Sequence, residues 1–320
     1  MINNTHTDLR LNGDPAADTA MQHIFTKHGY AATGHLIAFL TDLEEVKQHE
    51  SFPELDTFIA ENQISILNKK NIIRACDFYK KHQISIGLLL ACYSLPYCYL
   101  GENGARVLGF SKRMENDTTN RLKETGQFLK IIFRYDNWLS GLAPRAILKV
   151  RLLHAVWRHK LSHSDKWDMA WGTPVNQEDM IGTNLSFSLL IIRGLKKMGV
   201  YISSTEEAAY LTAWNDIGHL LGIRSEIDCG TYKLASAYDK SISQSQFRAS
   251  DIGKSLTKSL FDSLEKLTNN KLVHSYLLSQ SRILLGPQYS EWLGIKESKI
   301  PNVFLKSINL TSSIISSIYD

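Results

Sequence analysis

The chain has 320 residues, of which 43% are hydrophobic and 21% are charged, and its formal net charge is +4. This composition is typical of an ordered globular protein and excludes a disordered chain. Lysine and arginine are mixed with nearly as many acidic residues, so the charge pattern shows no surface for nucleic acid. No apolar run reaches the roughly 18 residues that cross a bilayer, and we expect no membrane span.

The spacing of the cysteines and the N-terminal residues indicate the cellular compartment in which we expect the protein. The four cysteines form no CxxC pair and match no zinc or iron–sulfur pattern; they are Cys76, Cys92, Cys98 and Cys229. Free, buried thiols in a reducing compartment are the expected state. The segment from Met1 to Asp8 has neither the basic nor the apolar region of a secretory signal. The expected location is therefore the cytoplasm.

The first half of the chain has the pattern of consecutive helices. Asp14 and Pro15 form a cap-and-proline start for a helix that ends near His28. Further helices are predicted over residues 32–46, 55–67, 71–81, 105–110 and 117–136. The most apolar stretch, residues 84–100, is predicted to be a buried helix that ends near Pro96, because proline cannot continue the helical hydrogen bonds without a kink.

The second half is also helical. Asn176 is predicted to cap a long helix that continues to Lys197. Ser204 and Glu207 have the spacing of a capping box for the next helix. Amphipathic helices are predicted over 144–161, 251–267 and 271–285, whereas residues 231–247 are less regular and the tail after Pro301 has no assignment. No alternating strand or low-complexity linker is found, so we predict an all-α fold with residues 1–320 as one domain.

The helix predicted over residues 144–161 carries the most informative pattern. His154 lies in the middle of an apolar stripe, with Arg151 one turn before it and Arg158 one turn after it. Two arginines next to a buried imidazole are unfavourable unless an anionic group pairs with them. A haem satisfies this pattern, with His154 on the iron and the arginines directed towards the propionates.

The alternative is that His154 is an ordinary core residue, while the flanking arginines extend to solvent and bury only their aliphatic stems. Spacing alone does not separate the two interpretations. Another pair, His159 and His163, has a four-residue spacing that could suit zinc, but the helix is predicted to end there and no HExxH motif is present. We interpret this pair as surface residues.

No motif for a competing chemistry is found. The chain has no GxGxxG and no GxxxxGK[ST], so nothing indicates dinucleotide or P-loop phosphate binding. The GxSxG motif of many serine hydrolases and the paired ExxH motifs of di-iron bundles are also missing. No CxxCH motif occurs, so any haem would be bound non-covalently.

Several motifs follow one another in a fixed order: YLGENGARVL at 99–108, RLKET at 121–125, RLLHAVWR at 151–158, GTPVNQEDMIGT at 172–183 and AYLTAWNDIGHLLG at 209–222. This ordered set resembles the rubber oxygenase family, which includes latex-clearing proteins and the fungal MpaB-type oxygenases. The RxxHxxxR pattern alone has little specificity, and the order of the whole set carries the resemblance. It covers about residues 14–225, and residues 226–320 are expected to form a helical C-terminal extension.

The resemblance implies a globin-like helical core that binds one haem b non-covalently. His154 matches the axial ligand of the haem iron and is therefore the expected metal ligand. Arg151 and Arg158 match flanking arginines that support haem binding. Arg121 and Thr125 match positions on the distal side of the haem, with Arg121 among the cofactor-binding residues.

Further residues complete the expected site. Thr183, at the end of its motif, is assigned to the cofactor-binding residues. Latex-clearing proteins carry a lysine just before the distal threonine, where this chain has Glu124. Glu102 is the nearest candidate for the upstream carboxylate that acts as a base in those proteins. The resemblance thus makes Glu102, Glu124 and Thr125 the expected catalytic residues.

The function that the resemblance implies is oxidative. Family members insert oxygen into the C=C bonds of isoprenoid chains and produce carbonyl fragments. We therefore expect a haem-dependent oxygenase that uses O₂ on a small hydrophobic, isoprenoid- or alkene-like substrate. A haem sensor or carrier without catalysis, and a helical interaction protein without the cofactor, are the alternatives. The sequence predicts no oligomeric state.

Overall fold

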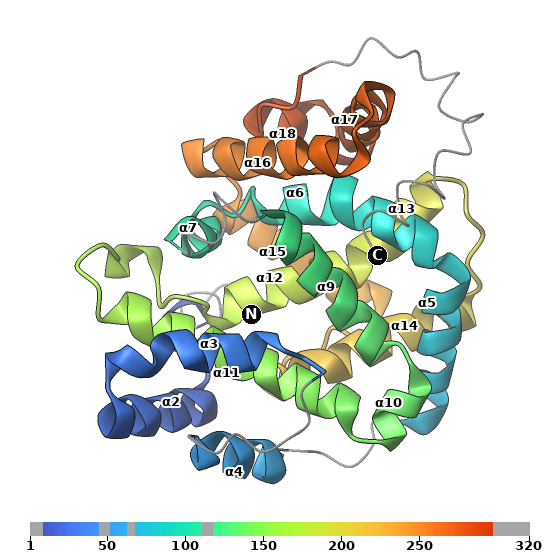
Figure 1. The fold of residues 1–320 in the computed structure, drawn as a ribbon. Coiled ribbons are helices and arrows are strands. Elements are labelled where there is room, and N and C mark those ends of the chain that lie inside the picture. Colours follow the sequence, from blue (N-terminus) through green and yellow to red (C-terminus); the bar gives the residue numbers. More distant parts are fainter. Residues whose placement is uncertain (1–8, 45–51, 63–67, 111–117, 297–320) are drawn as a thin grey trace.

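A computed structural model describes residues 9–44, 52–62, 68–110 and 118–296 as an assembly of helices (Figure 1). These ranges contain no strand, only an isolated bridge between Gly101 and Phe247. The all-α prediction is confirmed. Within the same ranges, no helix is both long enough and apolar enough to cross a bilayer.

The helices of the N-terminal half are α2 (Pro15–His28), α3 (Thr33–Thr41), α4 (Pro53–Asn62), α5 (Lys69–Leu89), α6 (Leu95–Cys98), α7 (Glu102–Phe110), α9 (Thr118–Ile132), α10 (Tyr135–Leu139) and α11 (Leu142–Ser162). Those of the C-terminal half are α12 (Gln177–Phe187), α13 (Leu189–Lys197), α14 (Ser204–Leu220), α15 (Tyr232–Gln246), α16 (Asp251–Thr268), α17 (Lys271–Leu285) and α18 (Pro287–Trp292). Shorter turns are η1 (Tyr30–Ala32), the π-helical η2 (Leu90–Ser94) and η3 (Met169–Trp171).

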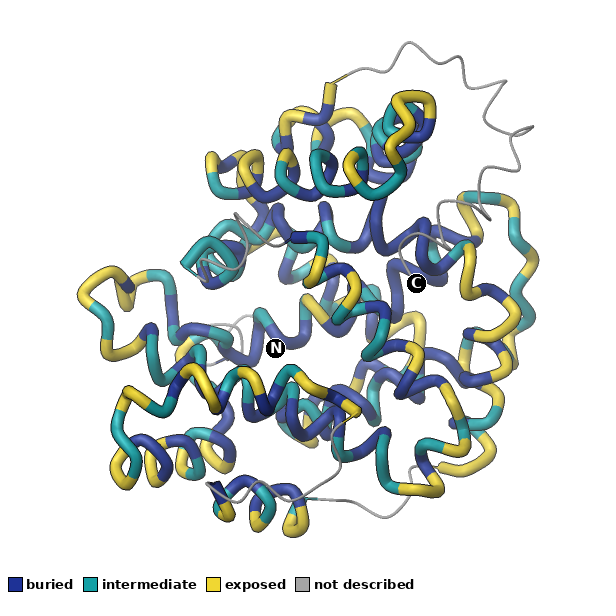
Figure 2. Tube along the Cα trace, viewed as in Figure 1, coloured by how far each residue is buried: buried dark blue, intermediate teal, exposed yellow. Residues whose placement is uncertain are grey.

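Helices α11 and α12 lie in the interior. α11 packs against α2 and α3 on one side and against α9 and α14 on the other, whereas α12 contacts α6, α14 and α15. Figure 1 shows α16, α17 and α18 as a layer at the far end from α2 and α4. Buried positions follow α11, α12 and α14, while the outer faces of α2 and α4 are exposed (Figure 2). This arrangement places the space between α11 and α6 near the middle of the molecule.

The apolar stretch before Pro96 differs from its prediction, because the helix does not end at the proline. Pro96 has no N–H for the Cys92 carbonyl, and the chain passes through the π-helical turn η2 before α6 continues to Cys98. The hydroxyl of Ser281 in α17 donates a hydrogen bond to the Cys92 carbonyl at 2.6 Å. A side chain from a distant helix thus satisfies the backbone group that the proline leaves without a donor.

Two other helix predictions are corrected. The predicted helices 71–81 and 84–96 form one continuous α5 up to η2, because no glycine or proline separates them and His82 is buried within the helix. The long helix after Asn176 starts as predicted but divides at Ser188 into α12 and α13. The Ser188 hydroxyl donates to the Asn184 carbonyl at 2.9 Å, a bond that commonly bends a helix.

The remaining differences concern helix ends and helices that the sequence predicted as one segment or did not predict. The capping box uses Ser203 and Glu206 in place of Ser204 and Glu207, since Ser203 has the extended backbone of a cap. Residues 231–247, expected to be irregular, form α15 with Thr231 as its cap. The 117–136 segment divides into α9 and α10, and α18 was not predicted. The predicted ends at 46 and 67 and the tail after Pro301 lie outside the described residues.

Candidate functional site

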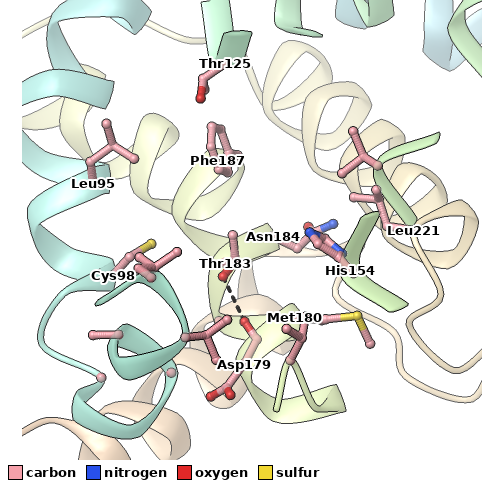
Figure 3. A pocket seen from close by; sticks show the side chains of 18 of the residues that line it. Leu95, Cys98, Thr125, His154, Asp179, Met180, Thr183, Asn184, Phe187 and Leu221 are labelled. Atoms are coloured by element: carbon pink, nitrogen blue, oxygen red, sulfur yellow. Dashed lines mark hydrogen bonds between the residues drawn. The ribbon is translucent and has the colours of Figure 1, made fainter. Parts of the chain in front are cut away.

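A cavity of about 400 Å³ lies between α11 and α6. This volume is within the range of roughly 300–1,000 Å³ that is usual for small-molecule sites. Helices α7, α9, α12 and α15 complete its walls, and most of its lining side chains are apolar. Figure 3 shows His154 on one side of the cavity and Leu95 and Cys98 of α6 on the other, with Phe187 and Thr183 of α12 between them.

His154 reaches the cavity from the middle of α11. Val150, one turn before it, and Trp157, one turn after it, line the same cavity, so the predicted apolar stripe faces inward. Burial and, to a smaller extent, the nearby Arg158 cation lower the pKa of His154 to about 4. The ring is therefore neutral at pH 7, which is the state that binds a metal. Its Nδ1 atom is buried without a hydrogen-bond partner among the described residues.

The flanking arginines are paired within the protein. Arg151 donates to both carboxylate oxygens of Asp14, at 2.5 and 2.8 Å. Arg158 donates to Asp18 at 2.7 Å and to the Val175 carbonyl at 2.5 Å. Neither arginine is among the residues that line the cavity. The anionic partners that the sequence argument required are thus two aspartates at the start of α2, which corrects the direction expected for both arginines.

The sequence predicts Asp14 as a helix cap, but it does not predict the ion pair of Asp14 with Arg151. The residue is buried, and its carboxylate lies against Gly222. Gly222 has a φ of +98°, and a Cβ atom there would lie 2.2 Å from an Asp14 oxygen. The Gln177 side chain also donates to the carbonyls of Gly13 and Gly222, at 2.7 and 2.9 Å. These contacts join the start of α2, α11, α12 and the end of α14 behind His154.

Helix α9 places Arg121, Glu124 and Thr125 in the cavity wall, as the resemblance implied. The hydroxyl of Thr125 donates to the Arg121 carbonyl at 2.8 Å. Thr183 lines the opposite wall, and its hydroxyl donates to the Asp179 carbonyl at 2.9 Å (Figure 3). Both hydroxyl protons are used within their own helices, so each threonine offers the cavity only the lone pairs of its oxygen.

Glu102, like Arg151 and Arg158, is an expected site residue that does not line the cavity. It begins α7 and is not among the cavity-lining residues. Its carboxylate accepts a hydrogen bond from Arg106, one turn later, at 2.6 Å. The spacing of Glu102 from the RLKET motif did not show the direction in which its side chain points, because that direction depends on how α7 packs.

Carboxylates that the sequence analysis did not assign to the site also line the cavity. Glu178 and Asp179, in the first turn of α12, both accept hydrogen bonds from Arg10, at 3.0 and 3.1 Å. Burial raises the pKa of Asp179, and the Arg10 cation opposes this shift. Asp239 of α15 is a further cavity residue. The sequence carried no signal for Asp239, since its helix was not predicted.

The histidine pair at the end of α11 has no place in the cavity. His163 is exposed, and His159 stacks on Phe25 with ring centroids 4.5 Å apart. In the described part of the chain, no group of three His, Cys, Asp or Glu side chains is arranged to hold a metal ion. His154, the expected metal ligand, therefore has no set of further protein ligands around it among the described residues.

Comparisons with known proteins agree with the geometry. The family model of the ER-bound oxygenase mpaB/B′ and rubber oxygenase catalytic domain matches residues 99–304. The chain belongs to this family. It is 25% identical to a rubber oxygenase of Streptomyces sp. (strain K30) over 292 residues, which are 90% of this chain and 68% of the relative.

A solved structure supports the fold. The structure of latex clearing protein LCP in the closed state matches with a TM-score of 0.76 and 21% identity, over 96% of this chain and 82% of that chain. The family resemblance recognised in the motifs is confirmed. As a member of this oxygenase family, the protein is an oxidoreductase.

Proposed function

We propose that this family member is a haem b-dependent oxygenase that cleaves C=C bonds of a hydrophobic, isoprenoid- or alkene-like substrate with O₂. The observation that carries the proposal is the neutral imidazole of His154 at the wall of a mostly apolar cavity. A buried ring nitrogen without a protein partner has no evident use in packing, whereas an imidazole is a common axial ligand of haem iron.

The residues of the cavity fit a haem held without covalent bonds. His154 would supply a nitrogen ligand to the iron, and the apolar side chains around it, including Val150 and Trp157, would pack against the porphyrin. Arg151 and Arg158, bound to Asp14 and Asp18, hold the helix that carries His154. When bound, the haem supplies the iron at which O₂ reacts, a chemistry that no amino-acid side chain provides.

The α9 wall of the cavity would act on the oxygen side. Arg121 brings a positive charge to the cavity, and Thr125 offers hydroxyl lone pairs next to it. Glu124 stands where the resemblance leads us to expect a lysine in latex-clearing proteins. With Glu124 in this place, the position offers the cavity a carboxylate and no amine that would bind the iron of a haem.

The apolar walls determine the class of substrate. Phe128, Phe187 and Leu95 surround the space between the two polar walls, and exclude water from it. An unsaturated hydrocarbon chain is the ligand that gains most from such a surface, because burial of apolar area is favourable. The balanced reaction is one C=C bond plus one O₂ giving two C=O groups, so the products are a pair of carbonyl compounds.

Haem binding is tested by reconstituting the purified protein with haemin. We expect a Soret band in the wild type, and loss of most of it in His154→Ala. His159→Ala is the matched control, because His159 lies on the same helix and outside the cavity lining, and it should keep the band. An equal band in His154→Ala, or none in any variant, contradicts the assignment. The absence of haem from all variants would favour a helical interaction protein.

Turnover is tested by measuring O₂ uptake and trapping carbonyl products. The reconstituted, reduced protein is given squalene in one arm and rubber latex in the other. We expect uptake and carbonyl formation with the small alkene. A Soret band without uptake in either arm would favour a haem sensor or carrier.

A further inference from the structure

The α6 side of the cavity, across from His154, carries polar groups as well as apolar ones. Tyr97 of α6 and Asp239 of α15 both line the cavity there, next to Ile242 and Phe247. Figure 3 shows α6 opposite His154, with Leu95 and Cys98 marking that wall. Asp239 thus adds a carboxylate to a cavity whose lining is mostly apolar.

Asp239 is held in place by two donors. The Tyr97 hydroxyl donates to its Oδ1 at 2.8 Å, and Arg193 of α13 donates to its Oδ2. Arg193 also donates to Ser236 at 3.1 Å, which orients the guanidinium along α15. Asp239 is only 8% exposed, so its carboxylate is a fixed acceptor and not a mobile surface charge.

The two donors leave Asp239 with unused capacity. Each carboxylate oxygen accepts about two hydrogen bonds, and Tyr97 and Arg193 take one on each oxygen. Burial and the neighbouring Asp239 raise the pKa of Tyr97, so the phenol keeps its proton and remains a donor to the carboxylate. The Arg193 cation balances the charge of the carboxylate. The pair therefore presents a neutral, preoriented acceptor to the cavity.

We propose that the α6–α15 end of the cavity is a hydrogen-bonding subsite, in which Asp239 accepts a hydrogen bond from a hydroxyl group at one end of the substrate. This inference rests on the proposed function, because it assumes that the cavity holds the unsaturated substrate. The substrate class is then an isoprenoid or similar alkene that ends in an alcohol. A pure hydrocarbon would leave the acceptor without a donor, which weakens its binding.

A purely structural role makes a different prediction. The Asp239–Arg193 pair also ties α15 to α13, and this alone would account for its burial. In that case the cavity should bind alcohols and ethers of equal size with equal affinity. Ligand preference therefore separates the two roles, whereas stability does not.

The test uses geraniol and geranyl methyl ether, which share the geranyl chain; in the ether a methyl group replaces the hydroxyl proton, so it keeps the oxygen but cannot donate a hydrogen bond. Binding of each to the purified protein, with any haem it carries, is measured by isothermal titration calorimetry. We expect the wild type to bind geraniol about tenfold more tightly than the ether. In Asp239→Asn the affinity ratio should fall through weaker binding of the alcohol, because the amide keeps a single, uncharged acceptor oxygen and Tyr97 already donates one hydrogen bond to that side chain.

Asp56→Asn is the matched control. Asp56 is also a largely buried aspartate paired with an arginine, Arg145 at 3.0 Å, but it does not line the cavity. This variant should keep the tenfold preference. A wild-type ratio near one, or an unchanged ratio in Asp239→Asn, overturns the subsite while the proposed function stands.

A wild-type ratio near one overturns the subsite even if Asp239→Asn does not fold, because that comparison needs no variant. Failure of both ligands to bind would overturn the hydrophobic substrate of the proposed function together with the subsite. The two failures are therefore distinguishable by whether the ether binds.

Discussion

The two walls of the cavity are built in different ways. The α11 wall is a regular helix whose arginines are held by buried ion pairs to Asp14 and Asp18. The α6 wall follows a π-helical turn, and the neutral hydroxyl of Ser281 holds its backbone at the Cys92 carbonyl. Ion pairs thus anchor one wall, whereas a hydrogen bond to a displaced carbonyl supports the other.

The difference shows how a charged helix can face an apolar space. On α11 the charges of Arg151 and Arg158 are neutralised away from the cavity, which leaves His154 as the polar group that reaches it from this helix. On the opposite wall the irregular backbone turns Tyr97 and Cys98 inward. The α11 wall brings the neutral imidazole of His154 to the cavity, and the α6 wall shapes the space in front of that ring.

The largest expected effect is on the α11 wall. Asp14→Ala leaves the guanidinium of Arg151 buried without its carboxylate, and should lower the free energy of unfolding by about 3–5 kcal/mol. Urea denaturation of the haem-free protein measures this loss. Asp262→Ala removes an exposed partner of Lys258 and should cost at most about 1 kcal/mol. Equal losses in the two variants would show that the α11 wall does not depend on its ion pair.

The α6 wall should respond less strongly. Ser281→Ala removes the donor to the buried Cys92 carbonyl, and we expect a loss of about 1–3 kcal/mol in urea denaturation. Ser290→Ala is the control, since its buried hydroxyl bonds the Gly286 carbonyl, which already accepts the Ser290 N–H. A loss in Ser281→Ala no greater than in the control would contradict the role given to this hydrogen bond.

Substitution of His154 should change the free energy of unfolding in the opposite direction. His154→Leu replaces a ring with an unpartnered buried nitrogen by an apolar side chain, so the haem-free protein should become about 1 kcal/mol more stable. The same variant should lose the Soret band after reconstitution. Thermal unfolding of the haem-free protein gives the first readout and absorbance the second. Destabilisation together with a retained band would show that His154 serves packing.

A smaller effect is expected away from both walls, at the start of α14. Hydrogen bonds from Lys81 and Ser203 lower the pKa of Glu206 from its ordinary value of 4.5 to about 2. Because the folded pKa is lower than the unfolded one, this stabilisation is fully present above pH 4.5 and is lost as the pH falls towards 2.

Glu206→Gln should therefore destabilise the protein by about 0.5–1 kcal/mol at pH 7, as expected for an exposed ion pair. The difference from the wild type should shrink as urea titrations are repeated between pH 4.5 and pH 2. A difference that stays constant with pH would contradict the assignment of the pKa shift to Glu206.

Local sequence was enough to predict much of the α11 wall. The helical period of 3.6 residues decides which side chains share a face, so the stripe around His154 was correctly placed before the fold was known. The capping role of Asn176 also followed from residues a few positions apart. The order of the family motifs identified the family, which the comparisons confirm.

What the sequence by itself determined about this protein is the all-α fold, the family and the inward face of α11. Only the tertiary structure decided that Asp14 and Asp18, 137 and 140 residues before their arginines, supply the negative charges. The same holds for the helix that continues past Pro96 and for Asp239 at the end of the cavity. The physical reason is that periodicity and caps act over a few residues, whereas the partner of a buried charge or a freed carbonyl depends on which distant helices pack together.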